Sequence, residues 1–578
     1  MNNNILEVKN LTIDFKTEGS IQNGVNKLNF NLLKGEVLGI VGESGSGKSV
    51  SSLSIMRLLP IPPAIIRDGE INFKLKSGKT VDILKLTEKE MRKLRGNEIA
   101  MIFQEPMTSL NPVMKCGEQV AEALILHKKI SKNAAKLRVI ELFKEVMIPR
   151  PEKIYDTYPH QISGGQKQRV MIAMAISCEP SLLIADEPTT ALDVTIQKVI
   201  LELLLNLQKK YGMSIIFITH NLGVIAQIAK RVLVIYRGEM MEEGDIEQIF
   251  KSPKHPYTQG LLACRPPIEA RYKRLPTVAD FLDNDKGVFS KEIKIFNYQK
   301  ITSEERIEHL NRIYSQEPLL RITNLNTEFV QEKSIFGKVK SVLKAVDSVS
   351  IDIYKGETLG LVGESGCGKT TLGRTILRMI EAKSGELWYK GRNIFTISNK
   401  EMKLLRREVQ IIFQDPYSSL NPRITIGEAI LEPMTVHKIG KNRAERKAKV
   451  VELLERVGLG NEHFGRYPHE FSGGQRQRIV IARALAVNPE LIICDESVSA
   501  LDVSVQAQVI NLLNELKEDF GFTYVFISHD LSVVKFMSDR IAVMKAGKIV
   551  ELGDADELYN HPKSEYTKIL IDSIPRGL

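Results

Sequence analysis

Two glycine-rich segments have the residue types and spacing that bind phosphate groups. They read Gly42-Glu43-Ser44-Gly45-Ser46-Gly47-Lys48-Ser49 and Gly363-Glu364-Ser365-Gly366-Cys367-Gly368-Lys369-Thr370. The glycines let backbone N–H groups curl around phosphates, the lysine reaches the terminal phosphates, and the last hydroxyl ligates Mg²⁺. Both segments are therefore predicted to be phosphate-binding (Walker A) loops that hold a nucleotide and Mg²⁺.

An acidic pair follows each loop much further along the chain. Asp186 and Glu187 come after the apolar run 182–185, and Asp495 and Glu496 come after 491–494. An aspartate at the end of a buried strand is placed to orient Mg²⁺, and the following glutamate can polarise the attacking water. The alternative for such a pair is simple helix capping.

Two further side chains recur with these acids. His220 and His529 each follow a strand-like segment and are predicted to lie near the γ-phosphate. Gln104 and Gln414 both end the string Ile-Phe-Gln and are candidates to ligate Mg²⁺ or to orient water. Cys367 lies inside the second loop, where Lys369 and a helix N-terminus favour its thiolate form and burial opposes it.

The chain repeats itself over most of its length. Ser163-Gly164-Gly165-Gln166 returns as Ser472-Gly473-Gly474-Gln475, at the same interval that separates the two acidic pairs and the two histidines. Repetition over this distance indicates a duplicated domain. The segment 265–317 has no counterpart and is predicted to be a linker with some structure of its own, between domains at 1–264 and 318–578.

The elements that position these residues alternate between strands and helices. The apolar runs 37–41 and 358–362 predict buried strands directly before each loop, and helices are expected at 49–59 and 371–380. Strand-like segments at 6–15 and 26–33 precede the first of these runs. Alternating strands and helices predict an α/β fold with a mainly parallel sheet covered on both faces.

Composition narrows the class of protein. The net charge of +10 over 578 residues is small and the basic residues are interleaved with acids, which disfavours nucleic acid as a partner. Five cysteines without a C-x-x-C spacing argue against a disulfide framework or a zinc site. The start lacks the features of a secretory signal and no apolar run approaches the ~18 residues of a membrane span, so a cytosolic, soluble chain is expected.

With the Walker A loops, the Ser-Gly-Gly-Gln strings resemble the signature of ATP-binding-cassette (ABC) ATPases, here twice in one chain. The resemblance implies two P-loop NTPase domains, each with a parallel core sheet, an antiparallel β subdomain and a helical signature subdomain. It also implies a head-to-tail pair in which ATP binds between one Walker A loop and the other signature. Site one then combines its own loop and acids with Ser472, Gly474 and Gln475, and site two is completed by Ser163, Gly165 and Gln166. Phe15 and Phe329 occupy the adenine-stacking position, with Phe336 as a rival for the second.

Other strings resemble ATPases of dipeptide and oligopeptide importers, a group that includes nickel and glutathione importers. They are Gln-Glu-Pro-Met-Thr-Ser-Leu-Asn-Pro at 104–112, its counterpart at 414–422, and His255-Pro256-Tyr257-Thr258, which becomes Ser564-Glu565-Tyr566-Thr567 in the second half. This implies an ATP-hydrolysing subunit at the cytoplasmic face of the inner membrane, peripheral to two transmembrane permease subunits and served by an extracytoplasmic solute-binding protein. Peptide is the favoured solute.

Two alternatives to the importer stay open, and one cofactor of its relatives is not expected. The alternatives are a twin-cassette ATPase acting on ribosomes or nucleic acid and an exporter ATPase. Many relatives carry a cysteine cluster after the first cassette, whereas here only Cys264 lies nearby. No iron–sulfur cluster is therefore expected.

Overall fold

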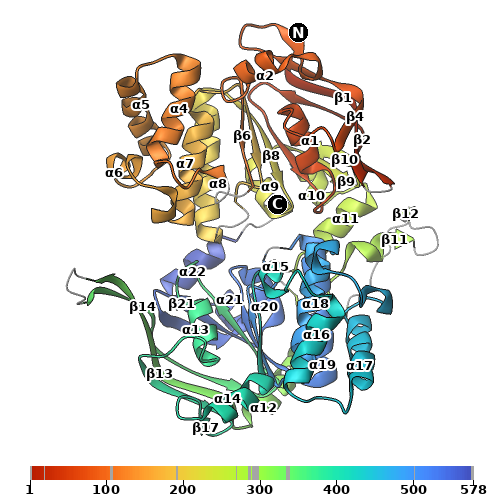
Figure 1. Ribbon diagram of the computed structural model, residues 1–578, viewed down its shortest axis with the longest axis vertical. Coiled ribbons are helices and arrows are strands. Elements are labelled where there is room, and N and C mark those ends of the chain that lie inside the picture. Colours follow the sequence, from red (N-terminus) through yellow and green to blue (C-terminus); the bar gives the residue numbers. More distant parts are fainter. Residues whose placement is uncertain are drawn as a thin grey trace.

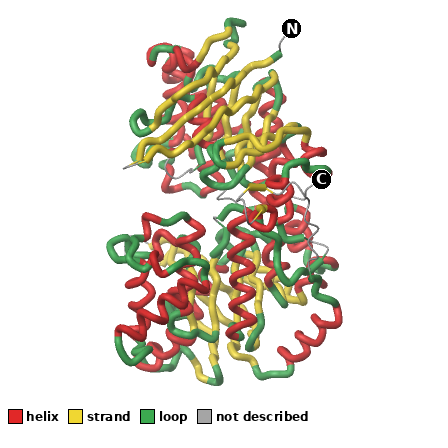
Figure 2. Tube along the Cα trace, turned by 90° about the vertical axis from the view of Figure 1, so that its right-hand side faces the viewer, coloured by secondary structure: helices red, strands yellow, loops and turns green. Residues whose placement is uncertain are grey.

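The computed structural model describes residues 3–17, 20–104, 109–189, 193–267, 270–283, 288–289, 299–333, 339–499 and 501–574. Its chain forms two lobes stacked along the long axis (Figure 1). The first lobe runs from β1 to α11 and the second from β13 to α22. The strands of the upper lobe slope across the view in Figure 2 while those of the lower lobe run close to vertical, so the lobes differ by a rotation.

Each lobe has a four-stranded antiparallel sheet. In the first lobe the order is β2-β1-β4-β5, with β1 Asn4–Thr17, β2 Ser20–Leu33, β4 Ala64–Lys74 and β5 Thr80–Asp82. In the second lobe it is β14-β13-β16-β17, with β13 Pro318–Lys333, β14 Val339–Tyr354, β16 Ser384–Tyr389 and β17 Arg392–Asn393. The long hairpins β1–β2 and β13–β14 contain several register shifts, which bend them over the neighbouring sheet.

Each lobe also has a six-stranded core sheet that is parallel except for one edge strand. The first has the order β10-β9-β3-β8-β7-β6, with β3 Val37–Val41, β6 Ile99–Ile102, β7 Leu182–Asp186, β8 Ser214–Thr219, β9 Arg231–Tyr236 and β10 Glu239–Asp245. The second has the order β18-β19-β20-β15-β21-β22, with β15 Thr358–Val362, β18 Val409–Ile412, β19 Leu491–Asp495, β20 Thr523–Ile527, β21 Arg540–Lys545 and β22 Lys548–Asp554. The central strands are buried along their whole length because both faces of the sheet are covered.

Side-chain alternation divides the core of the first lobe into two layers. Leu38 and Ile184 point toward the antiparallel sheet, whereas Val37 and Leu183 point toward helices on the other face. Because successive strand residues face opposite sides, one short apolar run serves both layers. The predicted α/β class, with a parallel core sheet and an antiparallel β subdomain, is confirmed.

Helices cover the sheets and form a separate group on one side of each lobe. The first lobe has α1 Lys48–Ile55, α2 Glu88–Leu94, α4 Cys116–Lys128, α5 Lys132–Glu145, α6 Pro151–Tyr155, α7 Gly164–Ile176, α8 Val194–Tyr211, α9 Leu222–Ile228, α10 Ile246–Lys251 and α11 Pro256–Ala263. The second has α13 Lys369–Ile376, α14 Asn399–Glu408, α15 Pro416–Ser419, α16 Ile426–Val436, α17 Arg443–Arg456, α18 Gly473–Leu485, α19 Val503–Phe520, α20 Leu531–Met537, α21 Ala555–Asn560 and α22 Glu565–Asp572. The groups α4–α7 and α16–α18 carry the Ser-Gly-Gly-Gln strings at the starts of α7 and α18 (Figure 1).

The helices after the phosphate loops are shorter than the sequence predicts. We expected helices over 49–59 and 371–380, but α1 ends at Ile55 and α13 ends at Ile376. Arg57 and Arg378 have φ of 48°, in the left-handed region that interrupts a right-handed helix. Short 3₁₀ turns also connect elements, at η1 Ile83–Lys85, η2 Pro159–Gln161, η3 Val278–Phe281, η4 Asn461–His463 and η5 Pro468–Glu470.

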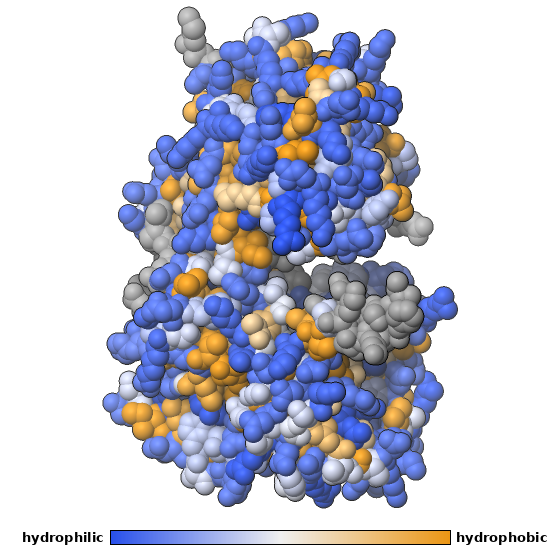
Figure 3. Space-filling model, turned by 90° about the vertical axis from the view of Figure 1, so that its left-hand side faces the viewer, coloured by the Kyte–Doolittle hydropathy of each residue, from blue (hydrophilic) through white to orange (hydrophobic). Residues whose placement is uncertain are grey.

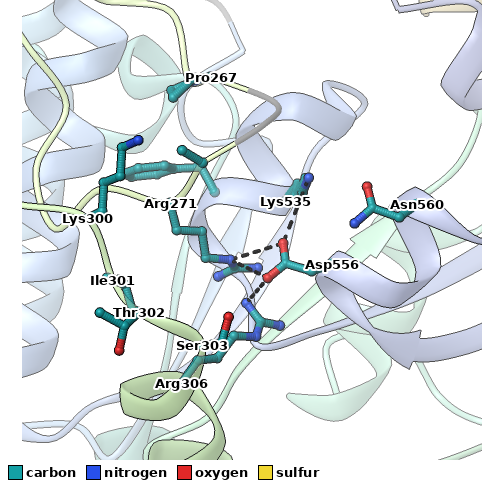
Figure 4. A pocket seen from close by; sticks show the side chains of 12 residues that line it. Pro267, Arg271, Lys300, Ile301, Thr302, Ser303, Arg306, Lys535, Asp556 and Asn560 are labelled. Carbon is teal, nitrogen blue, oxygen red and sulfur yellow. Dashed lines mark hydrogen bonds and ion pairs between the residues drawn. The ribbon is translucent and has the colours of Figure 1, made fainter.

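The described part of the segment between the lobes contacts both of them: Phe289 packs on Tyr236 and Tyr257 of the first lobe, whereas Arg271 and Arg306 bind the second. It contains β11 Leu282–Asp283, β12 Val288–Phe289 and α12 Ser303–Tyr314. Arg271, Arg306 and Lys535 converge on the carboxylate of Asp556 (Figure 4), with Arg271 Nε 3.1 Å and Lys535 Nζ 3.8 Å from it. Through Arg271 and Arg306 this part of the chain braces the second lobe.

A reciprocal pair of hydrogen bonds adds to this brace. The Leu275 N–H donates to Asn511 Oδ1, and Asn511 Nδ2 donates to the Leu275 carbonyl, both at 2.8 Å. Asn511 lies on α19, so the linker also contacts the long helix of the second lobe.

The face of the molecule shown in Figure 3 is mostly hydrophilic. Apolar side chains are scattered over the face shown in Figure 3 between larger polar areas. Among the helices that the structure describes, none has the length and apolar character needed to cross a bilayer.

Candidate active sites

The two phosphate loops leave the carboxyl ends of β3 and β15, the central strands of the core sheets. Gly47 and Gly368 begin the following helices with φ of 100° and 109°, in the left-handed region that glycine adopts readily. A Cβ atom would lie 2.6 Å from the Gly24 carbonyl oxygen at Gly47, and 1.9 Å from that of Ala345 at Gly368. Both positions therefore require glycine for conformation and for space.

The lysine of each loop bonds to the loop's own backbone. Lys48 Nζ donates to the carbonyls of Gly42 and Glu43, both at 2.7 Å. Lys369 Nζ makes the same bonds to Gly363 at 2.7 Å and Glu364 at 2.9 Å. Burial lowers the pKa of Lys48, and the carboxylates around it oppose this effect. The loop thus holds its cation where phosphate oxygens would replace the carbonyls.

A hydroxyl and an aspartate lie together in both lobes. Ser49 Oγ donates to Asp186 Oδ1 at 3.3 Å, and Thr370 Oγ1 donates to Asp495 Oδ1 at 2.8 Å. Burial raises the pKa of Asp186 to about 6 and also raises that of Asp495. Hydroxyl and carboxylate oxygens are ligands that Mg²⁺ prefers, so these pairs fit that ion.

The next glutamate contacts a glutamine and a histidine. Gln104 Nε2 donates to Glu187 Oε2 at 3.2 Å, and His220 Nδ1 lies 3.1 Å from Glu187 Oε1. In the second lobe the corresponding distances are 3.0 Å from Gln414 Nε2 and 3.5 Å from His529 Nδ1, both to Glu496 Oε2. Each site therefore assembles Gln, Glu and His from three neighbouring strands, as their positions in the sequence predict.

In each site, the interaction between the histidine and its neighbouring glutamate shifts the pKa of the histidine. Burial lowers the pKa of His220, but the hydrogen bond and charge of Glu187 outweigh burial and the pKa lies above its ordinary value. The same balance raises the pKa of His529. For Glu496, burial raises the pKa, and the His529 interaction more than offsets it so that the net pKa is lowered. The second pair thus favours a carboxylate beside a histidine cation.

Both glutamates have an unusual backbone that the sequence did not reveal. Glu187 has φ of 46° and Glu496 has φ of 49°, in the left-handed region that non-glycine residues rarely adopt. Their N–H groups are held by the carbonyls of Ile218 at 2.9 Å and Ile527 at 3.0 Å. Such strain costs about 1–3 kcal/mol and is concentrated at functional positions. Here it turns each glutamate from the strand end toward the phosphate loop.

A cavity of about 360 Å³ surrounds the first loop. Its lining includes Phe15, Ser44, Lys48, Gln104 and Glu187. The aromatic ring and the phosphate loop thus face one space, as stacking on adenine requires. In the second lobe Phe329 is 40% exposed, and its rival Phe336 lies outside the described residues.

The lobes touch through phosphate loops on one side and the starts of α8 and α19 on the other. Ser44 donates to Asp502 from its backbone N–H at 2.7 Å and from Oγ at 2.9 Å. The corresponding Ser365 N–H donates to Asp193 at 3.4 Å. Asp502 also lies 4.0 Å from His220, so a residue of the second lobe reaches the first site.

The structure does not place the signature residues around the first cavity. Its lining comes from the first lobe alone, without Ser472, Gly474 or Gln475. Instead Ser472 caps α18 by accepting the Gln475 N–H at 3.3 Å, and Ser163 caps α7 through Gln166 at the same distance. Residues 191, 192 and 500, from the repeated string Ala-Leu-Asp that ends at Asp193 and at Asp502, lie outside the described part of the chain.

Of the two possibilities for Cys367, the structure favours a buried, neutral thiol. The residue is only 7% exposed, and burial raises the pKa of its thiol despite the nearby Lys369. Lys369 Nζ lies 3.7 Å from the sulfur, but its strongest contacts are the two loop carbonyls. Desolvation of the sulfur therefore outweighs the neighbouring positive charge.

These features define the class of protein: a P-loop ATPase with two nucleotide sites, each carrying a lysine, a hydroxyl, an aspartate, a glutamate and a histidine. The sequence profile of the family described as "ABC transporter" matches residues 25–190 and 346–499. The profile described as "Oligopeptide/dipeptide transporter, C-terminal region" matches 241–287 and 550–577. The chain belongs to the ABC transporter family and is one of its ATP-hydrolysing subunits, with two cassettes in one polypeptide.

Known relatives match almost the whole chain. The glutathione import ATP-binding protein GsiA of Pectobacterium atrosepticum is 48% identical over 99% of this chain and 89% of its own length. GsiA of Escherichia coli K12 is also 48% identical, over 99% of this chain and 90% of its own. Among solved structures, the dimeric post-hydrolysis state of the cassette MJ0796 with ADP and phosphate has 28% identity and a TM-score of 0.37, covering 41% of this chain and 98% of that one.

Proposed function

We propose that this chain is the ATPase of an importer that takes up glutathione or a related peptide. The observation that carries the proposal is that both cassettes hold a full set of hydrolytic side chains, and each is followed by a match to the oligopeptide transporter C-terminal region. Relatives named for glutathione import align over 99% of the chain, which supports this solute within the peptide class. The segments 1–264, 265–317 and 318–578 then serve as first cassette, linker and second cassette.

Each side chain of site one has a separate role in ATP binding and hydrolysis. Lys48 and the loop N–H groups bind the phosphates, and Phe15 stacks on the adenine. Ser49, Gln104 and Asp186 would hold Mg²⁺, which supplies positive charge against the phosphate oxygens.

Glu187 acts on the attacking water in this scheme. Its carboxylate accepts a hydrogen bond from that water and takes its proton, while His220 holds the carboxylate in place. In site two Lys369, Phe329, Thr370, Gln414, Asp495, Glu496 and His529 take the same roles.

Closure of the cassette pair completes each site. We infer that Ser472, Gly474 and Gln475 move onto the nucleotide at site one, and Ser163, Gly165 and Gln166 onto that at site two. The contacts of Ser44 with Asp502 and of Ser365 with Asp193 support this head-to-tail arrangement, because they already bring each phosphate loop against the facing cassette. Binding of ATP closes the pair, and hydrolysis with product release reopens it.

Opening and closing of the cassette pair can drive transport only if the movement is passed on to membrane subunits. The chain therefore works at the cytoplasmic face of the membrane with two permease subunits, which a solute-binding protein loads from the other side. The strings after Gln104 and Gln414 are the segments that would contact the permeases.

Reconstitution tests this function. The chain is combined with its two permeases in liposomes, and ATP hydrolysis is measured with the solute-binding protein empty, loaded with glutathione or loaded with a dipeptide. Loaded binding protein is expected to stimulate hydrolysis and to drive uptake. Lys48→Ala combined with Lys369→Ala is the control that should abolish both. A rate of ATP hydrolysis that does not change with any loaded binding protein would contradict the importer function.

A further inference from the structure

A tyrosine from the end of each cassette contacts the phosphate loop of the same cassette. Tyr257 lies in the first turn of α11 and Tyr566 in the first turn of α22. The Tyr257 hydroxyl accepts the Glu43 N–H at 3.1 Å, and the Tyr566 hydroxyl accepts the Glu364 N–H, also at 3.1 Å. The same bond thus occurs at the first residue after the leading glycine of both loops.

The surroundings of the two tyrosines differ while the bond is the same. The Tyr257 ring packs against Tyr236, with ring centroids 4.5 Å apart, whereas the Tyr566 ring faces Lys545 Nζ at 4.6 Å. Both side chains are buried, and burial raises the pKa of both hydroxyls, so they stay neutral at physiological pH. A feature kept while its environment changes indicates that the bond itself matters.

The helices that carry the tyrosines are anchored in the same way. Glu242 Oε2 accepts the His255 N–H at 3.0 Å, and Glu551 Oε2 accepts the Ser564 N–H at 3.0 Å. These glutamates lie on the edge strands β10 and β22. The anchor uses backbone N–H groups, which explains how Ser564 can replace His255 in the second cassette without moving the tyrosine.

The glutamate that the tyrosine binds has further contacts, both within the loop and with the facing cassette. Within the loop, the Glu43 carbonyl accepts the Ser46 N–H at 3.1 Å in addition to Lys48 Nζ. Across the boundary, the Glu43 carboxylate accepts a hydrogen bond from Ser504 at the start of α19. The second copy repeats this pattern, because Glu364 Oε1 accepts Thr195 Oγ1 at 2.9 Å.

We propose that Tyr257 and Tyr566 are positioning residues of the two phosphate loops, and that Glu43 and Glu364 transmit that position to the facing cassette. The loop backbone must hold its phosphate-binding shape before nucleotide arrives, and a bond that fixes its second residue, Glu43 or Glu364, lowers the cost of binding. The inference rests on the proposed role of these loops as ATP sites. It gives the region after each cassette a direct part in nucleotide binding.

Removal of a single hydroxyl tests the first half of this proposal. The full chain carries Lys369→Ala, so that binding of a fluorescent ATP analogue with Mg²⁺ reports site one. Tyr257→Phe in this background is expected to weaken binding about two- to tenfold, the range that one hydrogen bond supports. The melting temperature without nucleotide should stay close to that of the parent. The reciprocal pair, Lys48→Ala with Tyr566→Phe, should show the same loss at site two.

Tyr236→Phe is the matched control, since it removes a hydroxyl from the ring that packs on Tyr257. Its analogue affinity should equal that of the parent. If the parent itself binds no nucleotide, the proposed ATP site fails before the tyrosine is tested. If the parent binds and Tyr257→Phe binds equally well, or if the control Tyr236→Phe loses as much affinity as Tyr257→Phe, the positioning role is overturned.

A double-mutant cycle tests the second half. Glu43→Ala, Ser504→Ala and the pair are compared by ATP turnover in the assembled transporter. Because both substitutions break one bond, the double variant is expected to be no slower than the slower single variant. Losses that simply multiply would show that the two side chains act independently and would overturn the transmission across the boundary.

Discussion

Ser44 and Asp502 are 458 positions apart in the sequence, yet two hydrogen bonds of 2.7 and 2.9 Å join them across the boundary between the cassettes. The equivalent pair, Ser365 and Asp193, is joined by one bond of 3.4 Å. Asp193 instead caps α8 by accepting the Ile196 N–H at 2.9 Å, whereas Asp502 makes no side-chain cap on α19. The two aspartates occupy equivalent positions in the repeat but make different contacts: Asp502 mainly joins the cassettes, and Asp193 mainly caps its own helix.

Substituting these aspartates should separate their roles. Asp502→Ala is expected to speed hydrogen exchange in the peptide 42–49 at least tenfold, because a bond to a carboxylate contributes about 1.5–3 kcal/mol. Asp193→Ala should have a smaller effect on 363–370, but should destabilise the first cassette by about 1 kcal/mol through loss of the helix cap. Exchange measured by mass spectrometry and thermal unfolding of both variants check this. Equal protection changes at the two loops would contradict it.

Both nucleotide sites should hydrolyse ATP. Glu187→Gln and Glu496→Gln are each expected to retain ATP binding and to slow hydrolysis at the altered site about 10²–10⁴-fold, since the group that takes the proton is lost. Because the sites share one closure, either change should lower total turnover by well over half. The measurement is ATPase rate per chain in the assembled transporter. One variant at wild-type speed beside an inactive partner would show that the sites are not equivalent.

The brace between linker and second cassette should weaken in acid. Asp539 accepts the Thr358 N–H at 2.8 Å and pairs with Lys517 at 3.1 Å and His309 at 3.3 Å. Burial raises the pKa of Asp539, but these partners more than offset burial and hold the pKa well below the ordinary 3.8. A lowered folded-state pKa means that this stabilisation is present above about pH 4 and is lost as the pH falls through the folded-state value.

Asp539→Asn tests whether this stabilisation is lost as the pH falls. At pH 7 the variant should lose about 3 kcal/mol, because it leaves the partners of a buried carboxylate unpaired. The difference in melting temperature from wild type should shrink as pH falls below about 4, because Asp539 of the unfolded wild-type chain begins to gain a proton there while the folded chain still holds the carboxylate. Asp572→Asn, at the exposed end of α22, is the control and should show no such trend. A difference that is constant from pH 7 to 3 would refute the linkage.

The central residues of each nucleotide site could be predicted from local sequence patterns. The loop glycines, Lys48, Asp186 and His220 follow short apolar strands, and parallel strands bring their carboxyl ends to one edge of a sheet. The end of α1 was missed because the positive φ of Arg57 has no clear signal in the sequence. For α12 a signal existed: Thr302 and Glu305 have the spacing of a capping box, and the structure contains that box.

Contacts between distant segments could not be predicted in the same way. The bond from Glu43 to Tyr257 and the pairing of Leu275 with Asn511 depend on how complete elements pack, and no short pattern encodes them. The different roles of Asp193 and Asp502 are a further example. Their sequence contexts are nearly the same, and only the placement of the two lobes distinguishes them.

The thiol of Cys367 should be slow to react. All five cysteines are buried, and burial raises the pKa of this one, so little thiolate is available at neutral pH. Iodoacetamide at pH 7.5 is expected to modify Cys367 at least tenfold more slowly than a cysteine in an unstructured peptide, with all five sites reacting once the chain is unfolded. Mass spectrometry of digested samples measures each site.

Cys367→Ser, which copies Ser46 of the first loop, identifies the Cys367 peptide, because that peptide is lost from the labelled set. Rapid labelling of the folded chain that Mg-ATP slows would instead support the reactive thiolate that the sequence alone favours, and would mean that the loop opens far enough in solution to expose the sulfur.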